Sequence, residues 1–168
     1  MGNSELLILA TAIVVFAIFT LSLTEMQLQI SRNNIENKIE NYMIAEAKSF
    51  LEKLEIKKFD SNLNDDNSIP GGLSFPNDLT PVDSLGMEMD GLFDDIDDYI
   101  GVFSDERISI NNVDYYTDYE IECNVYYVNN FLDTSGVSSP TVKKKADVII
   151  KSDHLKNDMI FSRVFSFY

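Results

Sequence analysis

The sequence predicts an α+β fold in which one long N-terminal α-helix packs on a small antiparallel β-sheet. An uncharged apolar run opens the chain, apolar residues then recur at helical spacing, and the last third alternates apolar with polar residues. The first two patterns are typical of a helix with an apolar half and an amphipathic half, and the third is typical of strands. Residues 60–106 contain no Lys or Arg. We therefore expect four segments: 1–25, 26–59, 60–106 and 107–168.

The first segment is long and apolar enough to cross a membrane as a helix. The run from Leu6 to Leu23 has no charge, no Gly and no Pro, and it has about the length that a helix needs to span the hydrocarbon layer. A secretory signal peptide carries Lys or Arg before its apolar region, and residues 1–5 have neither. We therefore interpret residues 1–25 as a transmembrane helix that is not removed.

The second segment, 26–59, continues the helix with one apolar face. Apolar residues recur mostly three, four or seven positions apart. They are Met26, Leu28, Ile35, Ile39, Met43, Ala47, Phe50, Leu51 and Leu54. Alone, this pattern is that of an ordinary amphipathic core helix. Joined to the apolar run it makes one helix of about 55 residues, roughly 80 Å long, and we expect its amphipathic half to cover one face of the sheet.

The last segment is predicted to form an antiparallel meander. A first alternation places on one face Tyr119, Ile121, Cys123, Val125 and Tyr127. In a second alternation, the residues expected to point inward are Val142, Ala146, Val148 and Ile150. Those expected to point mostly outward are Lys143, Lys145, Asp147 and Lys151. Residues 159–168 are a third β-prone stretch, and a hairpin with Asn111 and Asn112 at its turn precedes the others, since Asn tolerates the positive φ of tight turns.

The acidic segment between helix and sheet is predicted to be a loop. It is dense in Asn, Asp, Ser, Pro and Gly, which favour turns, and its length indicates that it packs on the domain or contacts a partner. Near its end stand Asp90, Asp94, Asp95, Asp97 and Asp98. Such carboxylates can bind Ca²⁺, but their spacing lacks the EF-hand pattern, so we favour a solvated loop. Alternatively, Asp97, Asp98 and Tyr99 fix the loop by hydrogen bonds to backbone amides.

Neither nucleic-acid binding nor catalysis is predicted. The formal net charge is −15, whereas binding to phosphates needs clustered Lys and Arg. The basic run 143–145 is too short, and it faces acids that can neutralise it across strands. His154, the sole histidine, lies in a polar link, and the sole cysteine, Cys123, is expected to be a buried, inert thiol. The sequence has no glycine-rich phosphate loop and no His/Cys cluster, so we expect no enzyme, cofactor or metal.

Glu5 and the architecture around it resemble the type IV pilins and pseudopilins, the prepilin-type family. The features in common are a glutamate at the fifth position of an apolar N-terminal helix, an amphipathic continuation and a small antiparallel sheet. The resemblance implies that the sequence is the mature form and that Met1 is the N-methylated residue left when prepilin peptidase removes a leader. A second, less specific similarity is the stretch "FDDIDDYIG", whose motif residues have no assigned role: Asp94, Asp95, Asp97, Asp98, Tyr99 and Gly101.

This resemblance implies a structural subunit of an extracellular filament, a pilus or fimbrium at the cell surface. The apolar helices would form the core of a helical homo-oligomer, built by the pilus assembly machinery from subunits held in the inner membrane. A carboxylate in an apolar environment costs at least a few kcal/mol without a partner, and an α-amino group is charged at neutral pH. Glu5 would therefore pair with the amine of Met1 of a neighbouring subunit. Otherwise, Glu5 is an interfacial residue favoured by the helix dipole.

Other functions remain open from the sequence. The chain can be a minor pilin, a type II secretion pseudopilin or a non-polymerising binding domain anchored by one membrane span, and archaellins are more distant relatives. Filaments of this kind serve cell adhesion, twitching, DNA uptake and electron conduction. The chain also departs from many pilins, because its helix lacks Pro and its lone cysteine excludes an intrachain disulfide. If part of the helix unwinds on assembly, we expect it at residues 20–24, and we expect C-terminal Phe and Tyr residues to hold the end of the sheet by packing.

Overall fold

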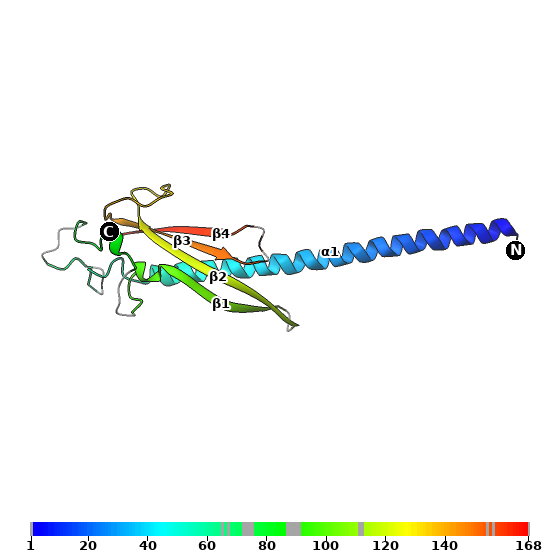
Figure 1. Cartoon of the computed structure of the whole chain (residues 1–168), viewed down its shortest axis with the longest axis horizontal. Coiled ribbons are helices and arrows are strands. Elements are labelled where there is room, and N and C mark those ends of the chain that lie inside the picture. Colours follow the sequence, from blue (N-terminus) through cyan, green and yellow to red (C-terminus); the bar gives the residue numbers. More distant parts are fainter. Residues whose placement is uncertain are drawn as a thin grey trace. The chain divides into compact units, whose positions relative to one another are not determined.

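The computed structural model contains one long helix and a four-stranded antiparallel sheet (Figure 1). The structure describes residues 2–64, 66, 68–71, 76–86, 92–110, 113–153, 155 and 157–167, and for residues 102, 104–110 and 113–117 it describes the backbone alone. The helices are α1 (Asn3–Glu55), η1 (Val82–Ser84) and η2 (Asp97–Tyr99). The strands are β1 (Gly101–Ile110), β2 (Val113–Tyr127), β3 (Lys143–Lys151) and β4 (Met159–Ser166). The predicted α+β fold is confirmed.

The chain divides into two units, residues 1–40 and 41–168, each with its own internal contacts. The first unit consists of the N-terminal part of α1, which is helical throughout from residue 3. Its threonine hydroxyls donate to carbonyls four residues earlier: Thr11 to Leu7 at 2.8 Å and Thr20 to Phe16 at 2.8 Å. Such bonds satisfy a polar group within an apolar helix. The whole of α1 ends at Glu55, four residues before the boundary that we expected.

In the second unit, the C-terminal part of α1 lies along the sheet (Figure 1). Its buried residues, each at most 8 % exposed, are Met43, Ala47, Phe50, Leu51 and Leu54. These positions form one helical face. At its ends, Tyr42 meets Tyr119 of β2 edge to face with ring centroids 6.3 Å apart, and Phe50 meets Phe103 of β1 at 5.3 Å. The expected cover for the sheet is therefore present.

The four strands follow one another in the order β1-β2-β3-β4, all antiparallel. The alternation predicted for β2 is confirmed, because its five inward residues are at most 8 % exposed. Across β2 and β3, Cys123 pairs with Val148 and Val125 with Ala146, so the register joins the apolar positions of the two strands. Strand β1 begins at Gly101, earlier than the boundary at 107 that we expected. Asn111 and Asn112 lie outside the described residues.

The predicted alternation in β3 is correct at three inward positions and agrees with the partial exposure of Lys143, Asp147 and Lys151, but it is wrong for Val142 and Lys145. Ala146, Val148 and Ile150 are fully buried, but Val142 precedes the strand and is 39 % exposed. The inward position before Ala146 belongs to Lys144, which is fully buried. Lys145 was expected to face outward but is only 8 % exposed, because its Nζ donates to the carbonyl of Asp133 at 3.1 Å.

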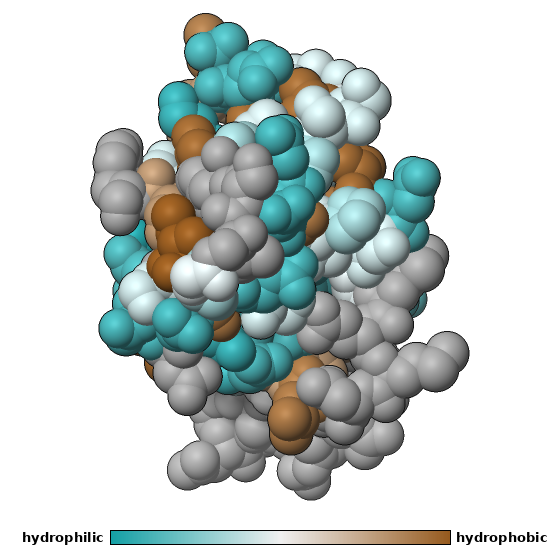
Figure 2. All heavy atoms as spheres, turned by 90° about the vertical axis from the view of Figure 1, so that its left-hand side faces the viewer, coloured by the Kyte–Doolittle hydropathy of each residue, from teal (hydrophilic) through white to brown (hydrophobic). Residues whose placement is uncertain are grey.

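The acidic segment packs on the rest of the second unit. This is one of the two roles that its length predicted, the other being contact with a partner. Three apolar residues of the segment, Leu63, Leu79 and Ile96, are at most 4 % exposed, and Phe59, which directly precedes it, is 5 % exposed. Before β1 begins at Gly101, its described part contains η1, η2 and a parallel bridge that joins Asp95 to Lys58, and no strand. At the end of the unit that bears these loops, hydrophilic residues cover most of the described surface and hydrophobic ones form separate spots (Figure 2).

The C-terminal strand is held by aromatic packing, as predicted. Phe165 of β4 is 9 % exposed, and the ring of Phe167 lies 5.8 Å from that of Phe59. Phe59 follows α1 closely in sequence, so this contact joins the end of the sheet to the chain that leaves the helix. Tyr168 lies outside the described residues.

The packing of α1 on the sheet predicts that Leu54→Ala destabilises the second unit by about 2–5 kcal/mol. Leu54 is fully buried, so its removal leaves a cavity. Ile56→Ala is the matched control, since Ile56 is 82 % exposed and its truncation should change stability by less than about 0.5 kcal/mol. Urea unfolding of the full chain in detergent, followed by the near-ultraviolet circular dichroism of tyrosine, measures both. Equal losses in the two variants would contradict the packing described.

Candidate functional site

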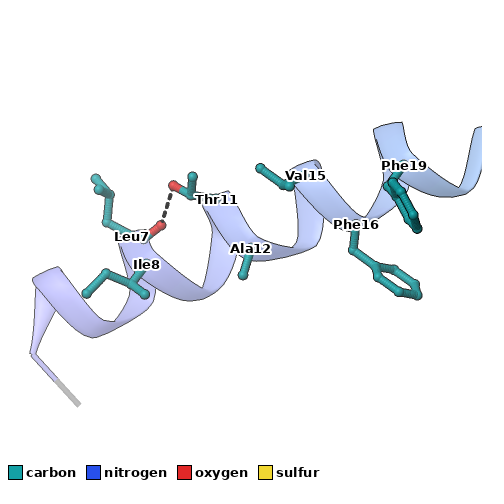
Figure 3. A pocket seen from close by; sticks show the side chains of 7 residues that line it. All are labelled: Leu7, Ile8, Thr11, Ala12, Val15, Phe16 and Phe19. Atoms are coloured by element: carbon teal, nitrogen blue, oxygen red, sulfur yellow. Dashed lines mark hydrogen bonds between the residues drawn. The ribbon is translucent and has the colours of Figure 1, made fainter. Parts of the chain in front are cut away.

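The structure offers two candidate sites, of which the first is the apolar surface of the N-terminal part of α1. Every large apolar side chain from Leu6 to Ile30 is 45–71 % exposed. Figure 3 shows the side chains of seven residues between Leu7 and Phe19, which line a shallow hollow along the helix. This helix is long and apolar enough to cross a membrane, and its apolar window has no buried residue. A surface of this size calls for a cover, either lipid or other apolar side chains.

Glu5 lies in the first turn of this helix and makes a bond within its own chain. Its Oε2 accepts the backbone N–H of Gly2 at 3.2 Å. This is half of a capping box, in which the third helical residue reaches back to the residue before the helix, and the helix dipole favours the negative charge there. A carboxylate offers about four acceptor positions, so this bond leaves room for a second donor. Met1, the expected source of that donor in a neighbouring subunit, lies outside the described residues.

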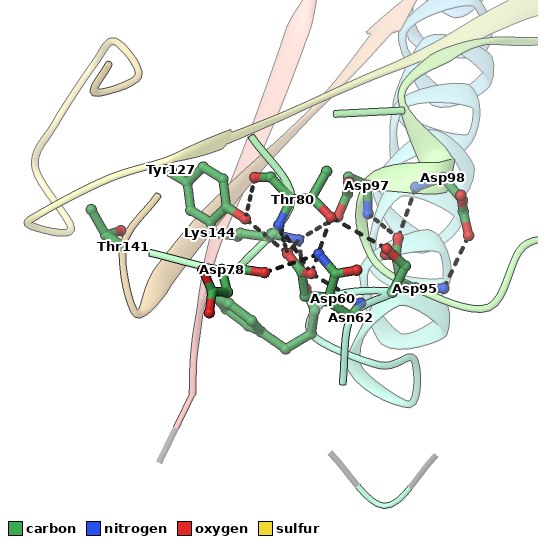
Figure 4. A network of polar contacts seen from close by, with 12 residues as sticks. Asp60, Asn62, Asp78, Thr80, Asp95, Asp97, Asp98, Tyr127, Thr141 and Lys144 are labelled. Atoms are coloured by element: carbon green, nitrogen blue, oxygen red, sulfur yellow. Dashed lines mark hydrogen bonds and ion pairs between the residues drawn. The ribbon is translucent and has the colours of Figure 1, made fainter. Parts of the chain in front are cut away.

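The second candidate is a buried polar cluster in the second unit, centred on Lys144 of β3 (Figure 4). The Nζ of Lys144 donates to the carbonyl of Phe59 at 2.7 Å, to Oδ2 of Asp60 at 3.0 Å and to Oδ1 of Asp97. Lys144 and Asp60 are fully buried, and Asp97 is 1 % exposed. The rings of Phe59 and Tyr127 lie 5.0 Å and 5.2 Å from Nζ, where they attract the cation and exclude water.

Three segments far apart in the sequence bring these groups together. Asp60 stands just after α1, Asp97 opens η2, and Lys144 occupies an inward position of β3. The backbone of Lys58 joins the first two segments, because its N–H donates to the carbonyl of Asp94 at 3.1 Å and its carbonyl accepts the N–H of Ile96 at 3.0 Å. This parallel bridge sets the acidic segment beside the end of the helix.

Asp60 is held in its ionised form by several donors. The hydroxyl of Tyr127 donates to its Oδ2 at 2.8 Å, and Thr80 donates both its backbone N–H, at 3.1 Å to Oδ2, and its hydroxyl, at 3.0 Å to Oδ1. Burial by itself would raise the pKa of Asp60, but the charge of Lys144 and these hydrogen bonds outweigh it and lower the pKa. Burial and the nearby Asp60 carboxylate raise the pKa of Tyr127, which therefore keeps its proton as a donor.

The acidic motif folds on itself through backbone amides. Oδ2 of Asp98 accepts the N–H groups of Asp94 at 2.9 Å and Asp95 at 3.0 Å, and Oδ1 of Asp95 accepts those of Asp97 at 2.9 Å and Asp98 at 3.1 Å. The solvated loop that we favoured is therefore wrong for Asp95 and Asp97, which are buried. The alternative, hydrogen bonding to backbone amides, is confirmed for Asp98. Asp90 lies outside the described residues.

Asp94 remains at the surface of the motif. Its Oδ2 lies 2.5 Å from the Nζ of Lys58, and its side chain is 40 % exposed. The hydrogen bond from Lys58 lowers the pKa of Asp94. Within the described part of the chain, no group of three or more His, Cys, Asp or Glu side chains is arranged to hold a metal ion. The cation that the buried carboxylates meet is the ammonium group of Lys144.

Asp95 differs from the other carboxylates of the cluster. Its Oδ2 is buried and has no hydrogen-bond partner among the described residues. Burial raises the pKa of Asp95 to about 8, and the charge of Asp97 adds to the effect. Asp95 is therefore mostly neutral at pH 7, in the same buried cluster as the two carboxylates that Lys144 contacts.

The last two motif residues have structural roles. The ring of Tyr99 packs against those of Phe50, Phe93 and Phe103, with centroids 5.8, 5.1 and 6.2 Å away. Gly101 begins β1 with a φ of +144°, a conformation that only glycine adopts at low cost. The motif at 94–101 is thus a compact turn that delivers Asp97 to Lys144.

Cys123 and His154 are the two residues considered for catalysis. Cys123 is fully buried in the sheet, and burial raises the pKa of its thiol to about 12. A thiol that stays protonated is a poor nucleophile, which supports the inert thiol that we expected. His154 lies outside the described residues.

No protein-family model, no curated protein and no solved structure matches the chain. The apolar helix surface with Glu5 and the buried cluster around Lys144 are therefore the two features on which a function can be based.

Lys144→Met should destabilise the second unit by about 3–5 kcal/mol, because it leaves Asp60 and Asp97 buried without their cation. The same substitution at Lys151 of β3 is the control. Lys151 forms an ion pair with Glu122 and its side chain is 41 % exposed, so Lys151→Met should leave the urea midpoint almost unchanged. A Lys144→Met protein as stable as the wild type would contradict the central place of this charge.

Asp95 predicts a loss of stability as the pH rises. Its pKa is about 8 in the folded protein and near the ordinary value of 3.8 in the unfolded chain. The folded state binds the extra proton between these values, so the stability present at low pH is lost by up to about 1.4 kcal/mol per pH unit as the pH rises towards 8. Asp95→Asn keeps the accepting Oδ1 and has no proton to lose, so its stability should fall less over this range.

Asp94→Asn is the control for this measurement. The pKa of Asp94 is lowered, so its contribution has the opposite sign and is present above its unfolded pKa. The unfolding free energy of the three proteins, measured from about pH 5 to pH 8, separates the cases. If wild type and Asp95→Asn lose stability in parallel, Asp95 is not the group responsible.

Proposed function

We propose that this chain is a structural subunit of a type IV pilus-like filament and that it polymerises through the N-terminal part of α1. The observation that carries the proposal is the uncharged helix surface from Leu6 to Leu23, exposed along its whole length, with the carboxylate of Glu5 at its start. The same helix continues into the unit that contains the sheet. A helix of this kind supports packing against copies of itself in a filament core.

Glu5 provides the argument for assembly rather than simple anchoring. Among apolar helices its carboxylate needs a cation or donors, and the Gly2 amide supplies one of them within the chain. The amine of Met1 of a neighbouring subunit would supply the charge. Each pair would fix the axial stagger between two helices, because an unpaired charge in the core costs more than a shifted apolar contact.

Before assembly, the same surface would lie in the inner membrane. Prepilin peptidase would generate Met1 as the first residue, which is then N-methylated, and the pilus assembly machinery would transfer the subunit from the membrane to the filament. The acidic, mostly hydrophilic loop end of the second unit (Figure 2) supports an exposed position in water, as the surface of an extracellular filament requires.

A membrane-anchored domain that never polymerises is the second candidate. The hydrogen bond between Glu5 and Gly2 favours it, since the carboxylate then has a partner in its own chain and the helix dipole adds to it. Minor pilins and secretion pseudopilins share the filament mechanism and differ in copy number, which quantification of the chain in sheared filaments gives directly.

The N-terminus tests the proposal directly. We expect intact mass and N-terminal fragment spectra of the chain, taken from the fraction sheared off cells, to start at Met1 with one added methyl group. A longer or unmethylated N-terminus, found with membranes alone, would favour the anchored domain.

Glu5→Gln separates the two roles of the carboxylate. The amide oxygen still accepts the Gly2 N–H and caps the helix, but the charge that would pair with an amine is gone. If pairing drives assembly, surface filaments counted by electron microscopy should fall at least tenfold in Glu5→Gln and also in Glu5→Leu, in line with a loss of about 1.4 kcal/mol or more per subunit contact. Glu25→Gln, on the same helix, is the control. Filament numbers that fall in Glu5→Leu and stay normal in Glu5→Gln would assign Glu5 to capping alone.

A further inference from the structure

We propose that Lys144 and Asp97 form an intramolecular amide bond, an isopeptide cross-link, with Asp95 as the residue that relays the protons. The Nζ of Lys144 and the carboxylate of Asp97 are in direct contact, and both side chains are buried to 1 % exposure or less. The link would join β3 to the turn before β1. This proposal does not depend on the filament function, because all of its residues lie in the second unit.

Asp97 is a better acceptor for the amine than Asp60, the other carboxylate at Nζ. Asp60 accepts hydrogen bonds from Tyr127, from Thr80 and from the N–H of Asn62 at 3.2 Å as well as from Lys144. These donors stabilise its negative charge, and an ionised carboxylate resists attack at carbon. Asp97 has no comparable set of donors among the interactions that the structure describes, so fewer interactions have to be given up when its carboxylate reacts.

Asp95 has the position and the proton that the reaction needs. Its Oδ1 is fixed by the N–H groups of Asp97 and Asp98, so the carboxyl group stays beside Asp97. Its Oδ2 is buried with no partner among the described residues. A buried polar atom without a partner is uncommon and calls for an explanation, and a neutral carboxyl group that gives and takes protons is one.

The step balances without a co-reactant. The Lys144 ammonium gives one proton to the Asp97 carboxylate that it contacts, which leaves a neutral acid beside a neutral amine. Nζ attacks Cγ of Asp97, the C–N bond forms, and the C–O bond to the hydroxyl breaks. A second proton from Nζ reaches that hydroxyl through Asp95, and one water leaves. Asp95 ends in its initial state, and nothing is oxidised or reduced.

The site also favours the reaction by proximity and by excluding water. The fold holds amine and acid in contact, and such positioning is equivalent to an effective concentration of about 10⁵–10⁸ M in well-oriented systems. Around Nζ, the rings of Phe59 and Tyr127 and full burial keep the site dry, which weakens the ionised pair relative to its neutral form. Ammonium and carboxylate would otherwise persist as a buried ion pair, which is the competing outcome of the test.

The intact mass of the full-length chain gives the answer. We expect the wild-type protein, purified in detergent and unfolded for mass spectrometry, to be lighter by one water, about 18 Da, than its sequence requires. Proteolysis should yield a branched peptide that joins Lys144 to Asp97. Full mass in the folded wild-type protein would overturn the proposal and leave the ion pair.

Three variants locate the bond and its relay. Lys144→Arg should have full mass, because its guanidinium group does not form the amide. Asp97→Asn should lose ammonia, about 17 Da, instead of water, and Asp95→Asn, which keeps the accepting Oδ1, should have full mass or at least tenfold less cross-link. Loss of water that persists in Lys144→Arg, or a branched peptide at Asp60, would contradict the assignment. Efficient cross-linking in Asp95→Asn would remove Asp95 from the mechanism.

Discussion

The second unit depends on the burial of one cation, the ammonium group of Lys144. A charge without water needs partners on all sides, and the chain supplies them from three directions: the carbonyl of Phe59, the carboxylate of Asp60 and the carboxylate of Asp97. These partners belong to the segment after α1 and to the turn before β1. The long acidic segment therefore packs on the sheet through Asp60 and Asp97, the carboxylates that neutralise Lys144. The hydrogen bonds that Asp95 and Asp98 accept within the motif fix the position of Asp97.

The first unit differs from the second, because it exposes an apolar surface instead of burying a charge. From Leu6 to Leu23 it presents apolar side chains with no cover in its own unit, which lipid or other helices can supply. Glu5 is the one charged side chain close to that surface at its N-terminal end. The two charges thus differ in their surroundings, because Lys144 is buried and Glu5 is exposed. Lys144 finds every partner within its own chain, whereas Glu5 has the Gly2 amide and room for a donor from elsewhere.

The helix and the strands could be predicted from the sequence, but the buried polar cluster around Lys144 could not. Alternation identified the inward face of β2 because apolar side chains repeat there every second residue, and helical spacing identified Met43, Ala47 and Leu54. Lys144 was missed although the same alternation gives it an inward position, because a lysine is expected to lie in water. Its partners are 84 and 47 residues away, and no local pattern indicates such pairs. By contrast, the bond between Glu5 and Gly2 spans three residues, and the position of Glu5 in the first turn already indicated a role at the helix terminus.

The positions of these partners have a mechanical consequence. Asp60 stands five residues after the end of α1, whereas the chain needs the whole acidic segment to travel from there to the sheet. The contact between Asp60 and Lys144 bypasses that segment, because it ties the exit of the helix directly to β3, which has a neighbouring strand on each side. Tension applied along α1 would therefore reach the sheet through this buried contact as well as through the apolar face of the helix that packs on the sheet. In a subunit that is held by its helix, a covalent bond from Lys144 to Asp97 would replace the ion pair between them with a connection that tension cannot separate by moving charges apart.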